Sequence, residues 1–133
     1  MRMTQTEARG PLKGLRVVEL GQLIAGPFCG QLMADFGAEV IKVEPPVTGD
    51  AMRQWGRPGK DGKPVWWEVI ARGKRSITLD LRQEEGQQVL RDLAATADVL
   101  IENFRPGTME RWGLGYDTLS TLNPRLIMVR VSG

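Results

Sequence analysis

Short apolar runs alternate with polar and glycine-rich segments along the chain, and these runs predict β-strands. The run at residues 98–104 has a continuous apolar centre, which indicates a strand buried on both faces, as in a parallel sheet. Residues 65–71 are apolar and aromatic, and their pattern fits either a strand or a short helix. The other predicted strands are residues 16–20, 39–44, 76–81 and 126–131.

Between the first two predicted strands, apolar residues recur at helical spacing and predict a short helix with one apolar face. We expect this helix to begin at Gly26 and Pro27, because the first helical residue tolerates the missing N–H of proline. Gly37 is expected to end it, since glycine adopts a positive φ without strain. The apolar face consists of Phe28, Leu32, Met33 and Phe36.

The clearest predicted helix is residues 83–97, with Glu84 and Glu85 near its positive N-terminal end. Two shorter helices are predicted at residues 108–112, capped by Thr108, and at residues 117–122. A basic turn is expected at residues 72–75, before the third strand. The apolar stripe of the long helix consists of Val89, Leu90, Leu93, Ala94 and Ala97.

The order of these elements predicts an α/β fold, a Rossmann-like parallel sheet flanked by helices and joined by right-handed crossovers. Residues 47–64 are rich in glycine, proline and charge, and we expect them to form a long surface loop. The predicted helices are too few to cover both faces of such a sheet, which indicates an incomplete large domain. Residues 1–10 are expected to be a disordered tail, and residues 11–133 the N-terminal part of the domain.

Composition narrows the class of protein. The 133 residues carry a net charge of +2, which is too small to indicate nucleic-acid binding. No apolar run is long enough to span a membrane, and the polar N-terminus does not resemble a secretory signal. Cys29 is the single cysteine, so the chain forms no internal disulfide, which fits a reducing, cytoplasmic location. The chain contains no histidine, the commonest general base near neutral pH.

Ligands of open α/β sheets bind beyond the carboxyl ends of the strands, so we expect the site there. The converging segments are residues 21–27, 44–46, 79–82 and 103–111. The glycines after the first strand do not have the spacing of the dinucleotide fingerprint or of a P-loop. Glu44 ends the second strand, where nicotinamide-cofactor proteins keep a ribose-binding acid, although a capping or solvated carboxylate is the commoner role.

Basic and aromatic residues near the same strand ends have two interpretations each. Arginine side chains there suit phosphate oxygens, or they form a solvated face. Trp55, Trp66, Trp67 and Trp112 could stack on a base, but core packing is the more usual role of tryptophan and is favoured for Trp66 and Trp67. Cys29 lies in the first turn of a helix, and without a histidine partner a packing role is favoured over a reactive one. The basic residues are Arg72, Lys74, Arg75, Arg82, Arg105 and Arg111.

Four ordered blocks of this sequence resemble the class III CoA-transferase family, which includes formyl-CoA transferase, carnitine CoA-transferases and α-methylacyl-CoA racemase. The segments ENFRPG with the following ME-R, and KRSI-LDL before it, are together highly specific for that family. The likeness covers almost all of residues 11–133 in register. The four blocks are residues 12–46, 73–82, 97–119 and 122–133.

The resemblance implies a Rossmann-like domain that binds coenzyme A (CoA), in a homodimer of two interlocked ring-like subunits. Arginines at the matching positions would meet the CoA phosphates, and apolar and backbone groups would hold the adenine. This sequence departs from the family pattern at two places near these contacts. Pro45 stands where some members have an arginine, and Gln83-Glu84 stands where a Thr-Pro often begins the next helix. The implied CoA-contacting residues are Leu23, Ile24, Ala25, Leu79, Asp80, Leu81, Arg82, Asn103, Phe104, Arg105 and Arg111.

In the transferase branch of the family, an aspartate attacks an acyl-CoA thioester, giving a mixed anhydride and then an aspartyl-CoA thioester. A carboxylic acid acceptor completes the exchange, and no metal takes part. In the racemase branch, a histidine and an aspartate move the α-proton of the acyl-CoA. In both branches the resemblance places these residues after the final Ser132-Gly133, so this chain is expected to hold no catalytic residue and to be inactive alone.

Three hypotheses follow from the sequence. The first is the N-terminal CoA-binding segment of a class III CoA-transferase, or of a racemase of that family. The second is a non-catalytic module that binds CoA. The third is a nicotinamide-dependent oxidoreductase domain that uses Glu44, which the glycine spacing disfavours.

Overall fold

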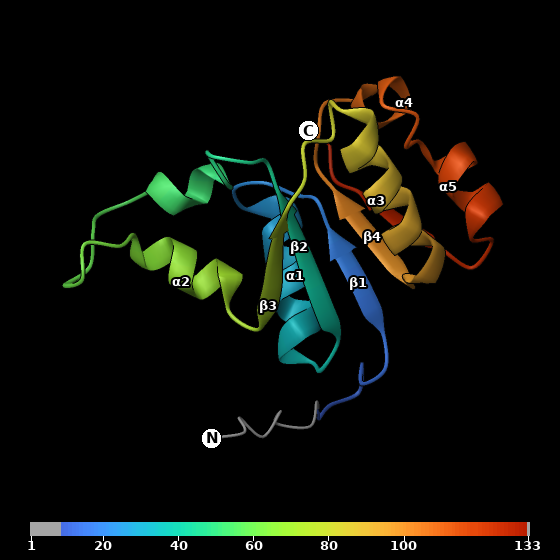
Figure 1. Ribbon diagram of the computed structural model, residues 1–133. Helices are drawn as coiled ribbons and strands as arrows, with labels where there is room; N and C mark the ends of the chain where they lie inside the picture. Colours follow the sequence, from blue (N-terminus) through green and yellow to red (C-terminus); the bar gives the residue numbers. More distant parts are fainter. Residues whose placement is uncertain (1–8, 133) are drawn as a thin grey trace, which may run out of the picture.

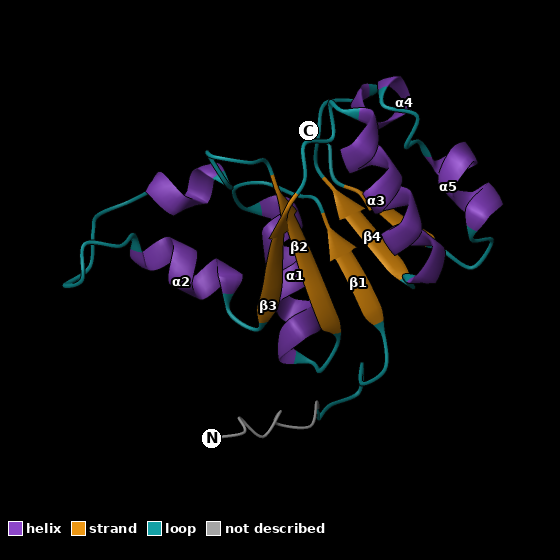
Figure 2. Ribbon diagram, in the orientation of Figure 1, coloured by secondary structure: helices purple, strands orange, loops and turns teal. Residues whose placement is uncertain are grey.

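The five strands form a single parallel sheet in the order β3-β2-β1-β4-β5 (Figures 1 and 2). The computed structural model describes residues 9–132. The strands are β1 (Arg16–Glu19), β2 (Glu39–Glu44), β3 (Lys74–Thr78), β4 (Val99–Glu102) and β5 (Ile127–Arg130). The helices are α1 (Ala25–Asp35), α2 (Val65–Ala71), α3 (Glu84–Thr96), α4 (Thr108–Arg111), α5 (Tyr116–Leu122) and the 3₁₀ helix η1 (Ala51–Gln54).

The strand order reverses beside β1, as in doubly wound α/β sheets. From β1 the chain moves outward through β2 to β3, and it then returns to the other side of β1 for β4 and β5. Val17 of β1 therefore pairs with Val40 on one side and with Val99 on the other. The predicted parallel α/β sheet flanked by helices is confirmed.

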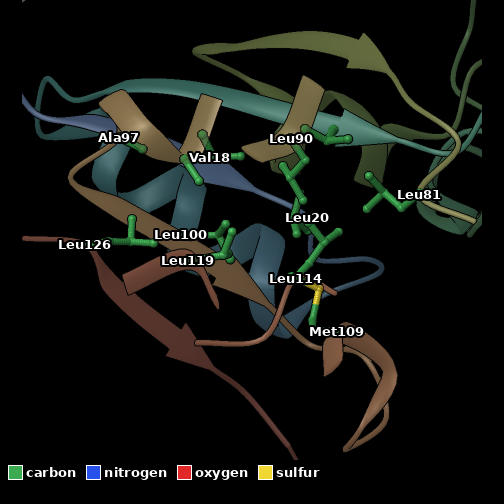
Figure 3. Close-up of a cluster of buried hydrophobic side chains, with 12 residues drawn as sticks. Val18, Leu20, Leu81, Leu90, Ala97, Leu100, Met109, Leu114, Leu119 and Leu126 are labelled. Atoms are coloured by element: carbon green, nitrogen blue, oxygen red, sulfur yellow. The ribbon is translucent and has the colours of Figure 1, made fainter. Parts of the chain in front are cut away.

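Alternate residues of the strands point to opposite faces of the sheet and form two separate apolar cores. On one face Val18, Leu20 and Leu100 pack beneath α3 and α5, and Figure 3 shows side chains from all these elements pointing toward one another. On the other face Val17 and Val40 pack against α1. β4 is buried along its whole length, as its continuous apolar centre predicted.

Most of the predicted apolar face of helix α1 points away from the sheet, and of its four members only Met33 packs against the core. Gly26 and Gly30 are buried, and a Cβ on Gly30 would lie 3.1 Å from Cγ of Glu19 in β1. Small residues are needed there because the helix lies so close to the sheet. The large apolar residues on the other side are exposed, namely Phe28 at 48%, Leu32 at 41% and Phe36 at 52%. The helix also begins at Ala25, so Pro27 is its third residue rather than its first.

Several predicted boundaries are corrected. β3 begins at Lys74, inside the predicted basic turn, and ends at Thr78, so the residues after it form a loop. Residues 65–71 form a helix, in which Trp66 is 56% exposed and is not part of the core. Gly107 with φ 83° precedes α4, and the Thr108 side chain makes no capping hydrogen bond.

The predictions for helix α3 and for the N-terminal tail have different outcomes. Helix α3 forms as predicted, except that Val89 faces solvent rather than the core. Residues 1–8 of the predicted tail lie outside the described residues. The backbone of Arg9 lies against Gly37, where a Cβ would be 2.6 Å from the Arg9 carbonyl oxygen.

Candidate functional site

A cleft opens at the carboxyl ends of the strands, where the sequence predicts the site. Its volume is about 420 Å³ including its open mouth. All strands of a parallel sheet end at the same edge, so residues that are far apart in sequence meet there. The lining residues are Leu20, Gln22, Val43, Glu44, Pro45, Leu79, Asp80, Leu81, Arg82, Phe104 and Trp112.

The walls of the cleft are mainly apolar and aromatic. Phe104, after β4, and Trp112, after α4, meet edge to face with their ring centroids 5.3 Å apart. Leu20 and Leu81 belong to the core beneath and give the cleft a rigid floor. Such a surface suits a flat ring system that stacks or packs against apolar side chains.

Polar groups lie at the rim of the cleft. The Arg82 guanidinium donates two hydrogen bonds to the Asp80 carboxylate, at 2.9 and 3.0 Å. These hydrogen bonds lower the pKa of Asp80 and raise the pKa of Arg82. The Arg82 side chain is exposed, so it can turn from Asp80 toward an anion such as a phosphate group.

Glu44 has a structural role. Burial alone raises its pKa, but hydrogen bonds from Arg53, Ser76 and the Asp50 N–H outweigh this effect and lower the pKa to about 2. Both carboxylate oxygens accept hydrogen bonds from Arg53, at 2.7 and 2.8 Å. Because its oxygens are already engaged, Glu44 is poorly placed to bind a ribose, and the geometry favours a capping carboxylate over a nicotinamide site.

The loop between β1 and α1 rests on a group of buried charges, which we call the ion network and define as Glu19, Lys42, Asp50 and Lys74. The side chains of these residues are at most 1% exposed. Lys42 Nζ lies 3.0 Å from Glu19 Oε1 and 2.8 Å from Asp50 Oδ2, and Lys74 Nζ lies 2.8 Å from Glu19 Oε2. Burial lowers the pKa of Lys74, although the Glu19 carboxylate opposes that effect.

The structure brings some of the predicted CoA-contacting residues together and separates others. Leu79, Asp80, Leu81, Arg82 and Phe104 all line the cleft. The others do not line it: Leu23, Ile24, Ala25, Asn103, Arg105 and Arg111.

Among those outside the lining, Asn103 holds the loop after β1. Its side chain accepts a hydrogen bond from the Gln22 N–H and donates one to the Gln22 carbonyl oxygen, both at 2.8 Å. Ile24 is 49% exposed and lies in a separate groove with Phe28 and Trp66. The exposed Arg111 donates a hydrogen bond to the Thr108 hydroxyl.

The predicted list lacks several lining residues. Leu20, Gln22, Val43 and Pro45 follow or end the first two predicted strands, so the strand-end rule that located the site would also have found them. Trp112 comes from the far end of a short helix, and only the packing of that helix against Phe104 brings it to the cleft.

The part of the chain that the structure describes lacks two kinds of feature. Across residues 9–132, no three His, Cys, Asp or Glu side chains are grouped so that they could hold a metal ion. Within the same residues, no helix has the length and apolar character needed to cross a membrane.

The fold is that of a doubly wound α/β domain, with a cleft at the carboxyl edge of the sheet, where ligands of such sheets bind. The chain belongs to CoA-transferase family III, which matches residues 12–133. The predicted family resemblance is therefore confirmed.

Individual relatives support the same assignment. A succinyl-CoA–D-citramalate CoA-transferase of Chloroflexus aurantiacus is 62% identical over 92% of this chain and 31% of its own length. A succinate–glutarate CoA-transferase of Agrobacterium fabrum is 46% identical, over 92% of this chain and 32% of its own length. The crystal structure of a CAIB/BAIF family protein from Brucella suis superimposes with a TM-score of 0.86 at 47% identity, over 93% of this chain and 34% of that one. The chain thus spans about a third of the length of these relatives.

Proposed function

We propose that this chain is the CoA-binding segment of a class III CoA-transferase that moves CoA between carboxylic acids. The observation that carries the proposal is the cleft at the carboxyl ends of β1 to β4, in a chain that matches the family over residues 12–133. Its apolar walls suit the adenine ring, which would pack against Phe104 and Trp112.

In this proposal, arginines at the rim hold the phosphate groups of CoA. Arg82 lines the cleft, and Arg105 and Arg111 are next in sequence to the aromatic residues Phe104 and Trp112. All three arginines are exposed, so their guanidinium groups can reorient toward a phosphate and bind its oxygens in pairs. The pantetheine arm would then lead the thioester toward catalytic groups outside these 133 residues.

The proposed chemistry proceeds through an aspartate supplied by polypeptide beyond this chain, in a homodimeric cytoplasmic enzyme. The carboxylate attacks the acyl-CoA carbonyl. This step forms a mixed anhydride and releases CoA thiolate. The thiolate then attacks the aspartyl carbonyl, releases the donor acid and forms an aspartyl-CoA thioester. The acceptor acid receives CoA by the reverse sequence of steps.

Dicarboxylic acids are the proposed substrates, because the relatives of Chloroflexus and Agrobacterium are named for succinyl-CoA or succinate as one partner of the exchange. The test incubates the full-length protein that contains this segment with succinyl-CoA and a series of carboxylic acids. Chromatography of the CoA thioesters should show transfer to a dicarboxylic acceptor, and absence of any transfer would contradict the proposal. Exchange of the α-proton of a branched acyl-CoA with solvent deuterium would indicate the racemase alternative instead.

Binding by the 133-residue chain itself is tested by isothermal titration calorimetry with CoA and with NAD as the control ligand. We expect saturable binding of CoA alone and no turnover of succinyl-CoA. Binding of NAD in preference to CoA would support the oxidoreductase alternative, and turnover would show that catalytic groups lie within this chain.

A further inference from the structure

The ion network is unusual because it places four formal charges, with no net charge, entirely out of contact with solvent. Removing a charged group from water costs several kcal/mol even after pairing, so apolar side chains of similar size would often stabilise a core as well. Stability alone therefore does not account for this arrangement. What distinguishes it is the set of backbone atoms that its members contact.

Three members of the ion network each contact the backbone of one segment, residues 21–27. Lys42 Nζ donates a hydrogen bond to the Gly21 carbonyl oxygen at 2.8 Å, and Lys74 Nζ donates one to the Pro27 carbonyl oxygen at 2.6 Å. The Leu23 N–H donates one to Asp50 Oδ1 at 3.0 Å. We call residues 21–27, which are the connection after β1 together with the first residues of α1, the β1–α1 loop.

This loop needs support because its backbone is strained. Leu23 has a φ of 63°, in the left-handed region that costs a non-glycine residue roughly 1 kcal/mol or more. Neighbouring Gln22 lines the cleft, and Asn103 holds both of its backbone polar groups. The cleft-lining Gln22 therefore lies between two supports, Asn103 on its own backbone and Asp50 on the backbone of Leu23.

We propose that the ion network positions the β1–α1 loop for ligand binding, with Lys42 and Asp50 as positioning residues that do not touch the ligand. The inference rests on the proposed function, because it takes CoA as the ligand of the cleft. The loop comes from β1, while its supports come from β2, β3 and the segment after β2, so the network ties the loop to the whole edge of the sheet.

Two substitutions of Asp50 separate its hydrogen bond from its charge. Asp50→Ala removes the acceptor of the Leu23 N–H, whereas Asp50→Asn keeps an acceptor oxygen and removes the charge beside Lys42. The matched control is Asp35→Asn, which neutralises an exposed carboxylate at the end of α1 that pairs with Arg72. Each variant of the 133-residue chain is examined by amide hydrogen exchange in NMR spectra and by calorimetric titration with CoA.

We expect the Leu23 amide of Asp50→Ala to exchange at least about tenfold faster than in the unaltered chain, while amides of β1 and β4 change little. The dissociation constant for CoA should rise by about tenfold, with a smaller change for Asp50→Asn and none for Asp35→Asn. A merely stabilising network would instead accelerate exchange of the loop and the strands together and would leave CoA affinity unchanged. That result would overturn the inference, as would rapid exchange of the Leu23 amide in the unaltered chain.

If Asp50→Ala fails to fold because Lys42 is left without its partner, the double variant Lys42→Met with Asp50→Ala keeps Glu19 and Lys74 as a neutral pair and removes the contacts to Leu23 and Gly21. The same selective acceleration in the loop is expected, and its absence would overturn the inference. Failure of the unaltered chain to bind CoA would instead overturn the proposed function. The role of the network in ordering the loop is then decided by the exchange of Leu23 alone.

Discussion

Substitution of Gly86 by alanine should destabilise the protein, against the usual effect of this change in a helix. Gly86 lies in the first turn of α3, and a Cβ there would be 2.2 Å from the Asp80 carbonyl oxygen and 2.8 Å from its carbonyl carbon. Ordinary contacts begin near 3.4 Å, so the helix and the loop after β3 must separate by roughly 1 Å. Gly→Ala in a helix normally gains about 1 kcal/mol, whereas overpacking costs about 1–3 kcal/mol. Because a Cβ this close to a backbone oxygen lies at the severe end of overpacking, we expect a net loss of up to about 2 kcal/mol in the free energy of unfolding.

The substitution also reaches the cleft, because Asp80 and Leu81 line it. Urea unfolding followed by circular dichroism measures the change in stability, and calorimetry with CoA should show several-fold weaker binding. Gln88→Ala, on the exposed side of the same helix, is the control and should change the free energy of unfolding by less than about 0.5 kcal/mol. A Gly86→Ala variant as stable as the unaltered protein would refute the close contact between α3 and the loop.

Three further predictions address the core, the buried carboxylate and the cleft. Leu100→Ala, at a fully buried position of β4, should lower the free energy of unfolding by about 2–5 kcal/mol in urea titrations. The pKa of Glu44 is about 2 in the folded protein against 4.5 ordinarily, so its stabilising effect is complete above pH 4.5 and is lost as the pH falls toward 2. Between pH 6 and pH 2.5, the free energy of unfolding should therefore fall less for Glu44→Gln than for the unaltered chain, by up to about 3 kcal/mol. Equal pH dependence of the two proteins would contradict the assignment. Trp112→Ala should weaken CoA binding about tenfold in calorimetry, whereas Trp66→Ala, in the exposed part of α2, should leave it unchanged.

The sheet could be predicted from the sequence because its strands carry an unambiguous signal. The run around Leu100 has three consecutive apolar residues, Val99 to Ile101, which is typical of a strand covered on both faces. The position of the cleft followed from the same information, since the ends of parallel strands meet at one edge. Topology placed the segments that contain Leu79, Leu81 and Phe104 at this edge, and the family resemblance named these residues individually.

The orientation of α1 could not be predicted from periodicity, because its large apolar residues and its small ones lie on different faces. Periodicity marks the side with Phe28 and Leu32 as apolar, whereas close packing on the sheet requires the side with Gly26 and Gly30. Which requirement prevails depends on the distance between helix and sheet, and that distance is a property of the assembled fold.

The ion network was missed for a related reason. A lysine within a strand, such as Lys42, is normally expected at the surface, since an isolated buried charge is costly. Its burial depends on Glu19, 23 positions earlier, and on Asp50 in the segment after β2, and both become its partners only when β1, β2 and that segment come together. No local sequence pattern indicates that these three segments come together.

The central place of β1 has a consequence for the order in which the chain folds. Arg16, its first residue, is hydrogen-bonded to Glu39, 23 positions later, and its N–H to Asp98, 82 positions later. The crossover through α1 to β2 can form early because its strands are close in sequence, whereas the second edge of β1 stays open until β4 has been synthesised. A nascent chain at that stage carries an unsatisfied strand edge, so chaperone dependence during translation should be greatest before β4 leaves the ribosome.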